Sequence, residues 1–407
     1  MLSKKIIFLS SFLLCNQLSA IDLGESTTLH GFGTLGGSYN TNGDFLYREN
    51  VFSNIGSSND FSLATHTKLG LQLDTNLTDN LKATIQTVLY QKEKGQIETD
   101  LDWAYLKYSH TEYLNFKLGR MKIPFFIFSD SSNINYTNIW THVPKETVIS
   151  SIPVSSYNGL EAEFLFNLKE HNISLQTYFG EEKSEIIGAL GGGTLDAEFK
   201  NAYGFSITDY YGDLKLRASY FAGDVKFRSN DLDTLLSTGR ALRIPTINNY
   251  DLSNLDMNLF ALGFTYQFDN IFLASEYTSV ELDNKVIDDM KGWYISTGYQ
   301  FDKFMPYITY AQSKQKVDYP INDIPILPEI YGGSKLYDGL NSTTQAFNYS
   351  QKSISLGLRY DIQKNLALKA QVDRIFFDEN HRTMYIRSAE PKDGHLDVYS
   401  IALDFVF

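Results

Sequence analysis

The sequence predicts an all-β fold, a transmembrane antiparallel up-and-down β-barrel of about 16 strands. Apolar residues recur at every second position in segments of about 10–14 residues from Thr28 onward, the period of a strand with one apolar and one wet face. Short and long connections alternate between these segments, as in up-and-down barrels. No stretch after residue 20 approaches about 18 consecutive apolar residues, so a spanning chain must close its backbone hydrogen bonds as a barrel.

The N-terminus has the pattern of an exported protein. Two lysines precede an apolar run over residues 6–14, and Leu18-Ser19-Ala20 then fits a cleavage site with small residues. This pattern predicts a secretory signal peptide in residues 1–20 and a barrel domain in residues 21–407. Cys15 suggests a lipid-modified N-terminus as an alternative, but the large Leu14 precedes it and a better cleavage site follows.

Composition excludes several classes of function. The chain has 35 Lys and Arg against 48 Asp and Glu, a net charge of −13, so it offers no basic patch for nucleic acid. Its only cysteine lies within the expected signal peptide, so the mature chain would have no disulfide, thiol nucleophile or thiolate metal site. No nucleophile elbow, Walker-type phosphate loop or pair of histidines at ligand spacing occurs. We therefore expect no catalytic residues, no metal and no cofactor.

We expect sixteen strands, an even number, which places both termini of the barrel at the same rim. Their approximate first residues are 28, 61, 81, 98, 113, 157, 172, 199, 213, 257, 271, 291, 304, 350, 365 and 396. The long connections are 41–60, 122–156, 181–197, 226–255, 316–348 and 378–394.

The last strand carries the strongest single signal. Its apolar residues alternate up to the terminal aromatic residue, and they are Tyr399, Ile401, Leu403, Phe405 and Phe407. This ending resembles the C-terminal signal that the assembly machinery of bacterial outer-membrane barrels reads. The alternative is the last strand of a soluble sheet. The resemblance implies a location in the outer membrane, with membrane lipid, lipopolysaccharide and the barrel-assembly machinery as partners.

Aromatic residues near strand ends predict a belt at the membrane interface, where amphipathic rings are favoured. The residues that occupy such positions are Trp293, Tyr299, Phe301, Tyr360, Tyr399 and Phe407.

A resemblance to a known family covers essentially the whole mature chain. Its motifs, in order, are 118–124 (Leu-Gly-Arg-Met-Lys-Ile-Pro), Ser129-Asp130, Trp140, 144–146 (Pro-Lys-Glu) and 156–159 (Ser-Tyr-Asn-Gly). They resemble the fifth strand, inward loop and sixth strand of the Gram-negative general-porin superfamily. The resemblance implies a sixteen-stranded homotrimer that passively conducts small hydrophilic solutes and ions, narrowed by the loop after strand 5. The apolar residues 125–128 depart from the glycine-rich acidic segment of well-known members.

Fixed charges at a narrow point would control such a pore. Alternation places five basic residues on the wet face, Lys68, Lys82, Lys117, Arg359 and Lys369, and Arg120 lies where the fifth strand ends. Because barrel closure brings the last strands beside the first, we expect most of them to form one basic wall. Asp130 and Glu146 lie in the long loop and could face it. The alternative is that all eight are ordinary solvated lumen residues.

The expected function is a passive diffusion channel in the outer membrane. The alternative is a barrel with another task, an outer-membrane hydrolase or a surface adhesin. Glu161 and Glu163 share one face of a strand and could suggest a pair of glycosidase acids, but such a pair would need a partnering cleft, whereas solvated lumen or rim residues need nothing further, so we favour the latter interpretation. The longest loop discriminates, because a channel folds it inward whereas an adhesin projects it.

Overall fold

The computed structural model describes residues 20–48, 55–93, 96–147, 155–189, 193–282, 284–315, 320–328, 331–347, 349–377, 383–385 and 394–407. Apart from Ala20, the expected signal peptide, Cys15 included, lies outside these residues.

Sixteen antiparallel strands form one closed barrel, which confirms the expected fold class and strand number. They are β2 (Thr27–Asn40), β6 (Lys68–Asn76), β7 (Leu81–Glu93), β8 (Gln96–Thr111), β9 (Leu114–Lys122), β10 (Ser156–Leu168), β11 (His171–Ala189), β12 (Gly193–Tyr211), β13 (Leu214–Arg228), β14 (Leu255–Phe268), β15 (Ile271–Leu282), β16 (Met290–Tyr299), β17 (Phe304–Gln315), β18 (Gln351–Gln363), β19 (Leu366–Phe377) and β20 (Gly394–Val406). Each strand pairs with the next along the chain, and β20 pairs with β2. The barrel therefore has no free edge along its length.

The second strand begins later than expected. We expected it near residue 61, whereas β6 begins at Lys68. Residues 61–65 instead form the short strand β5 (Phe61–Ser62) and the 3-10 helix η1 (Leu63–Thr65). β5 pairs with β2, as does β1 (Ile21–Asp22), and β3 (Tyr47–Arg48) pairs with β4 (Gly56–Ser57) in a separate small sheet.

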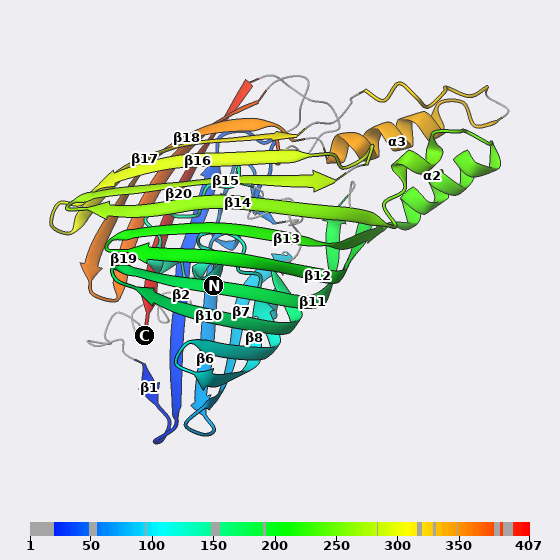
Figure 1. Ribbon diagram of the computed structural model, residues 1–407. Coiled ribbons are helices and arrows are strands. Elements are labelled where there is room, and N and C mark those ends of the chain that lie inside the picture. The colour runs from blue at the N-terminus through cyan, green and yellow to red at the C-terminus, as the bar shows by residue number, and fades with distance from the viewer. Residues whose placement is uncertain are drawn as a thin grey trace.

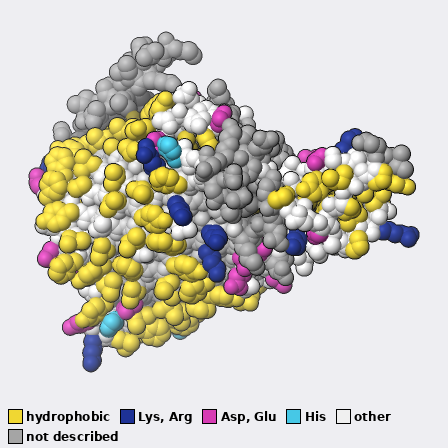
Figure 2. Space-filling view, turned by 90° about the horizontal axis from the view of Figure 1, so that it is seen from above, with side chains coloured by type: hydrophobic (Ala, Val, Ile, Leu, Met, Phe, Trp, Pro, Cys, Tyr) yellow, Lys and Arg dark blue, Asp and Glu magenta, His cyan; other side chains and the backbone are white. Residues whose placement is uncertain are grey.

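Side-chain alternation gives the barrel an apolar outer face. Along β16 buried and exposed residues alternate without interruption, and the large exposed ones are Trp293, Ile295 and Tyr299. Figure 2 shows hydrophobic side chains spread over the flank of the barrel. Tyr299, Phe301, Phe304 and Tyr360 lie together at one rim, and the last two rings stack at a centroid distance of 4.7 Å. Apolar side chains on the outer face suit contact with the hydrocarbon core of a bilayer, and the aromatic rings at the rim suit its interface with water.

The two rims differ in the length of their connections. Short turns join β6 to β7, β14 to β15 and β18 to β19 at one rim, which also holds the C-terminus (Figure 1). We call this the short-turn rim. The long connections lie at the opposite, long-loop rim, and the two longest join β9 to β10 and β17 to β18.

The last strand closes the barrel over glycines. The backbones of Phe407 and Gly31 exchange two hydrogen bonds, of 2.7 and 2.8 Å. A Cβ on Gly31 would lie 2.1 Å from the Phe407 ring, and one on Gly33 would lie 2.5 Å from the Phe405 ring. The two terminal aromatic rings thus occupy the space that side chains on β2 would need.

Two helices at the long-loop rim lie where the sequence predicted only loops. They are α2 (Asn230–Ala241) and α3 (Lys335–Ala346), which project beyond the barrel in Figure 1. Helices of this length are marginal alone, but Leu232, Leu236, Leu336 and Leu340 bury their side chains in one shared cluster. No helix among the described residues is both long and apolar enough to cross a membrane.

Candidate pore and the loop after strand 5

Charged side chains from the inner face of the barrel bind the start of the loop between β9 and β10, which we call the 123–155 loop. On β13, Arg217 donates to the carbonyl of Phe126 and Lys215 donates to that of Ile127, both at 2.8 Å. The Glu276 carboxylate on β15 accepts the Ile127 N–H at 2.6 Å. These bonds hold the apolar run 125–128 against the wall, with Phe125, Phe126 and Ile127 buried.

The loop then crosses the inside of the barrel. Asp130 pairs with Arg217 of β13 at 3.0 Å, and three residues later Asn133 donates to Asp102 of β8. Asp102 also pairs with Lys122, at 2.9 Å. β8 and β13 are five strands apart along the barrel. We call residues 130–133 the crossing segment, because they bridge these two walls.

A tryptophan packs the next part of the loop against the barrel. Trp140 is 1% exposed, and its indole N–H donates to Thr309 Oγ1 at 2.9 Å and Ser296 Oγ at 3.1 Å. Its ring lies edge-on to Phe128 and Tyr294, with centroids 5.5 and 5.8 Å away. Satisfying the polar indole atom allows the ring to be buried without loss.

A buried ion pair binds the loop to the last two strands. The side chains of Lys369 and Asp404 are 0% exposed and 2.8 Å apart. Lys369 also donates to the carbonyls of Asn135 at 2.6 Å and Trp140 at 3.0 Å. Lys369 was expected to face the aqueous pore. Its ammonium is instead saturated by the loop and Asp404, since a buried charge must be paired to be tolerated.

The loop reaches the short-turn rim. Tyr136 donates its hydroxyl to the carbonyl of Lys364, in the turn between β18 and β19. Arg359 donates to the carbonyls of Tyr136 and Asn138 at 2.7 and 2.9 Å, and its guanidinium lies 4.9 Å from the Tyr136 ring centroid. Arg359 therefore holds the loop, and the loop runs through the depth of the barrel along β13 to β20.

Three lysines form a row on the opposite wall. Lys82, Lys107 and Lys117 are directly paired across β7, β8 and β9. Like charges placed opposite each other are destabilising unless acids compensate them. Asp74 lies 3.0 Å from Lys82 at one end of the row, and Glu161 lies 2.7 Å from Lys117 at the other.

The expected basic wall therefore needs correction. Lys82 on β7 and Lys117 on β9 lie in one row, but Lys107 separates them and carboxylates flank the row at both ends. Arg120 pairs with Glu182 at 2.6 Å. Lys68 is partly buried on β6, and its side chain makes no hydrogen bond or ion pair with another described residue. Sequence reasoning missed Lys107, although its position on the wet phase of β8 was the available signal.

Glu146 binds the loop to the wall at β18, whereas we expected it to face the lysines. It is 4% exposed and accepts a hydrogen bond of 2.8 Å from Gln351 on β18. Burial raises the pKa of this carboxyl, although hydrogen bonds from Gln351 and Ser353 act in the opposite direction. Its backbone approaches Gly292 so closely that a Cβ there would lie 2.1 Å from the Glu146 carbonyl oxygen.

His142 of the loop and His66 form a pair of stacked rings that sequence spacing did not reveal. His142 lies 2.6 Å from the Tyr47 hydroxyl and 3.2 Å from the Asp373 carboxylate. The ring of His66 stacks on it with centroids 5.6 Å apart. Within the described residues, no group of three His, Cys, Asp or Glu could hold a metal ion.

Comparison with known families decides the assignment. A family model for Gram-negative porins matches residues 13–380. The chain belongs to the Gram-negative porin family. No curated protein sequence matches this porin.

Solved structures share the porin fold at low sequence identity. OmpF of Salmonella typhi, in a complex with daunomycin, is 16% identical with a TM-score of 0.57, over 96% of this chain and all of the other. The outer-membrane channel DcaP of Acinetobacter baumannii is 14% identical with a TM-score of 0.55, again over 96% and all. An anion-selective porin of Comamonas acidovorans is 13% identical with a TM-score of 0.54, over 94% and 99%.

Family and fold together assign the general activity. The porin is a passive diffusion channel for small hydrophilic solutes and ions across the outer membrane. Outer-membrane lipid surrounds its apolar flank, as the exposed leucines, isoleucines and aromatic residues of the strands require.

Proposed function

We propose that the crossing segment and the lysine row form the constriction of this channel. The observation that carries the proposal is the bridge from Arg217 on β13 to Asp102 on β8, made by Asp130 and Asn133. It closes off a sector of the lumen whose wall is β8 to β13. Solutes would pass between the crossing segment and that wall.

The side chains of this sector suit an aqueous path. Besides the lysines of β8 and β9, its buried inner face carries Asn115, Gln176 and Thr208. Asp130, on the loop side, has a half-exposed side chain, 54% accessible. An acid on one side and lysines on the other would set a field across the path, which low-dielectric walls strengthen.

Selectivity in this arrangement would be weak. Glu161 compensates Lys117, and Glu163, whose carboxylate accepts hydrogen bonds of 3.2 Å each from Asn115 and Ser174, adds a second acid to the same wall. A planar-bilayer recording with a salt gradient tests this. A small zero-current potential of either sign supports a balanced constriction, and a potential near the limit for a single ion contradicts it.

The packing of the 123–155 loop favours a channel over the alternatives. An adhesin would project this loop, whereas its described part is bound by β13, β15 and β18 to β20. We further propose that the porin carries out no catalysis. Glu146, Glu276 and His142, which could serve as acids or bases, are held in contacts that anchor the loop.

Export and assembly follow the family pattern in our proposal. Residues 1–20 are removed, the barrel-assembly machinery reads the terminal apolar residues of β20, and the product is a homotrimer in contact with lipopolysaccharide. N-terminal sequencing of outer-membrane material should begin at Ile21. Unheated samples in mild-detergent gels should show an oligomer that collapses on boiling, and a monomer in several detergents would remove the trimer without affecting the pore.

A further inference from the structure

The inner face of β12 to β14 changes character along its length. Ser206, Thr208 and Ser219 make the part of β12 and β13 nearer the short turns polar, and all three are buried there. Toward the long-loop rim the same faces carry Phe199 and Phe221, followed on β14 by Met257 and Leu259. An apolar inner wall is not what the passage of hydrophilic solutes alone requires.

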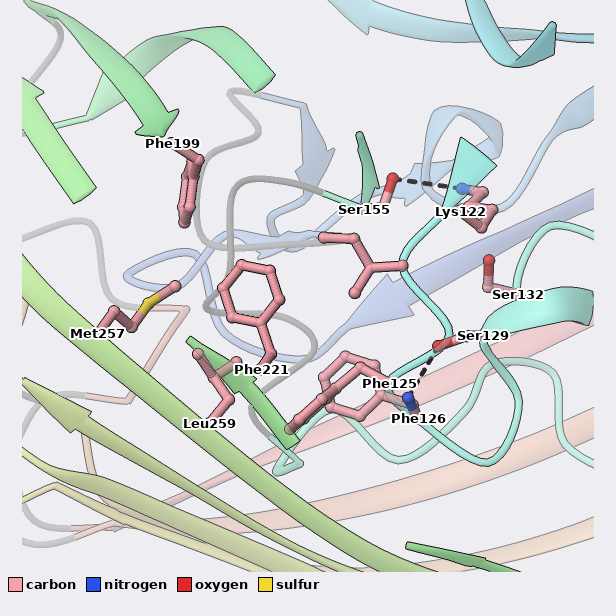
Figure 3. Close-up of a pocket in the computed structure, with 11 residues that line it drawn as sticks. Lys122, Phe125, Phe126, Ser129, Ser132, Ser155, Phe199, Phe221, Met257 and Leu259 are labelled. Carbon is pink, nitrogen blue, oxygen red and sulfur yellow. Dashed lines mark hydrogen bonds between the residues drawn. The ribbon is translucent and has the colours of Figure 1, made fainter. Parts of the chain in front are cut away.

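A cavity lies between this apolar wall and a polar edge. Figure 3 shows Phe199, Phe221, Met257 and Leu259 on one side, with Lys122 and three serines on the other, where Phe125 and Phe126 of the loop also line the cavity. The serines are Ser129, Ser132 and Ser155, and the cavity volume is about 60 Å³. Ser129 adjoins Asp130, so the cavity borders the crossing segment. Pockets with mostly apolar walls and a few converging polar groups are the usual form of a small-molecule site.

The polar edge can donate hydrogen bonds. Lys122 donates to Ser155 Oγ at 3.2 Å, and the Phe126 N–H donates to Ser129 Oγ at 2.8 Å. Each hydroxyl therefore already accepts one bond and keeps its own proton to donate. A ligand at this edge would supply an acceptor oxygen.

We propose that this cavity is a binding subsite for solutes that combine a small branched aliphatic group with an amide or similar carbonyl oxygen. A volume of about 60 Å³ corresponds to roughly four to six water-sized atoms, the size of an isopropyl group with a carbonyl. The aliphatic group contacts Phe199 and Met257, and the oxygen accepts from Ser129 or Ser155. The inference rests on the proposed channel for access and for its main readout.

Two neutral probes that differ in the aliphatic group test the proposal. The full mature chain is reconstituted in planar bilayers in KCl, and the current is measured with isobutyramide or acetamide. Isobutyramide has two more carbons, each worth about fourfold in affinity when buried. Isobutyramide should therefore halve the open-channel KCl current at a concentration roughly tenfold lower than acetamide does.

Matched variants locate the effect. Phe199→Ser removes apolar wall and should abolish the difference between the probes. Leu282→Ser, on the neighbouring β15, alters a similarly buried residue outside the cavity and should preserve it. Ser129→Ala combined with Ser155→Ala should weaken both probes by a similar factor, since the pair of substitutions removes both hydroxyl donors that the carbonyl oxygen can use. Heat-modifiable gel mobility verifies that each variant is folded.

The outcomes separate the subsite from the channel. Equal half-blocking concentrations for the two probes in the wild type would overturn the subsite, as would a difference that survives Phe199→Ser. An absence of KCl current would defeat the proposed function instead. Saturation-transfer NMR on the detergent-solubilised protein would then decide, with a tenfold preference for isobutyramide that Phe199→Ser abolishes supporting the subsite, and equal signals rejecting it.

Discussion

Replacing Lys369 by methionine should destabilise the barrel and loosen its loop. The substitution keeps most of the side-chain volume but leaves Asp404 as an uncompensated charge, with both side chains at 0% exposure in the wild type. Removing one partner of such a pair costs about 3–5 kcal/mol. Thr34 still donates to Asp404 at 2.6 Å and Asn135 at 3.1 Å, so we expect the lower end, about 3 kcal/mol.

Urea unfolding in lipid vesicles measures this loss, and a double variant provides its control. Lys369→Met with Asp404→Asn leaves no buried charge, so it should recover most of the free energy of unfolding. The loop also loses the donor to its Asn135 and Trp140 carbonyls. Single-channel recordings of both variants should therefore show more open-channel noise than the wild type.

The double variant distinguishes buried charge from simple loss of packing. If Lys369→Met changed the free energy of unfolding by less than about 0.5 kcal/mol, the pair would not be buried as described. If the double variant were as unstable as the single one, lost contacts rather than the unpaired carboxylate of Asp404 would be responsible.

Four further predictions test the 123–155 loop, the charges near it, and the pairing of β20 with β2 that closes the barrel, which we call the closing seam. Deleting residues 130–133 should raise single-channel conductance, and an unchanged value would refute their role in the constriction. Lys107→Glu should shift the zero-current potential toward cations, more at 0.1 M than at 1 M salt because screening is weaker at about 0.1 M, whereas Lys107→Arg should not. Burial raises the pKa of Glu146, so the contribution of this carboxyl to stability is fully present below the ordinary glutamate pKa and is lost as pH rises through the raised value. Glu146→Gln should therefore raise the thermal midpoint of unfolding at pH 8 but not at pH 4. Equal shifts at both pH values would contradict a raised pKa at Glu146. Deleting Phe407 should lower the folded yield in the outer membrane, as should Gly31→Leu, which removes the space for the Phe407 ring; normal yields would exclude the proposed role of the closing seam.

The sequence by itself determined the barrel. Strand alternation is a local property, because each side chain points to the face opposite its neighbour, whatever the strand pairs with. For that reason most expected strand starts agree with the structure to within a few residues, from Thr27 of β2 to Gly394 of β20. The expected long connection 181–197 was wrong, because β11 continues to Ala189 and β12 already begins at Gly193, so the two strands pair through most of it. The exception at β6 arose where residues 61–65 alternate like a strand but turn onto β2. The helices α2 and α3 were missed because their stability comes from packing against each other.

Only the tertiary structure decided which charges of the inner face the loop binds. Period two places Lys117, Arg359 and Lys369 equally on the inner face, and the sequence offered no means to separate them. The loop, not the strand, makes the difference: it covers β18 and β19 and consumes Arg359 and Lys369 in hydrogen bonds to its own carbonyls. Compensation of Lys117 by Glu161 likewise depends on cross-strand register. Contacts between residues more than a hundred positions apart in the chain have no local signal, so the site had to be read from the fold.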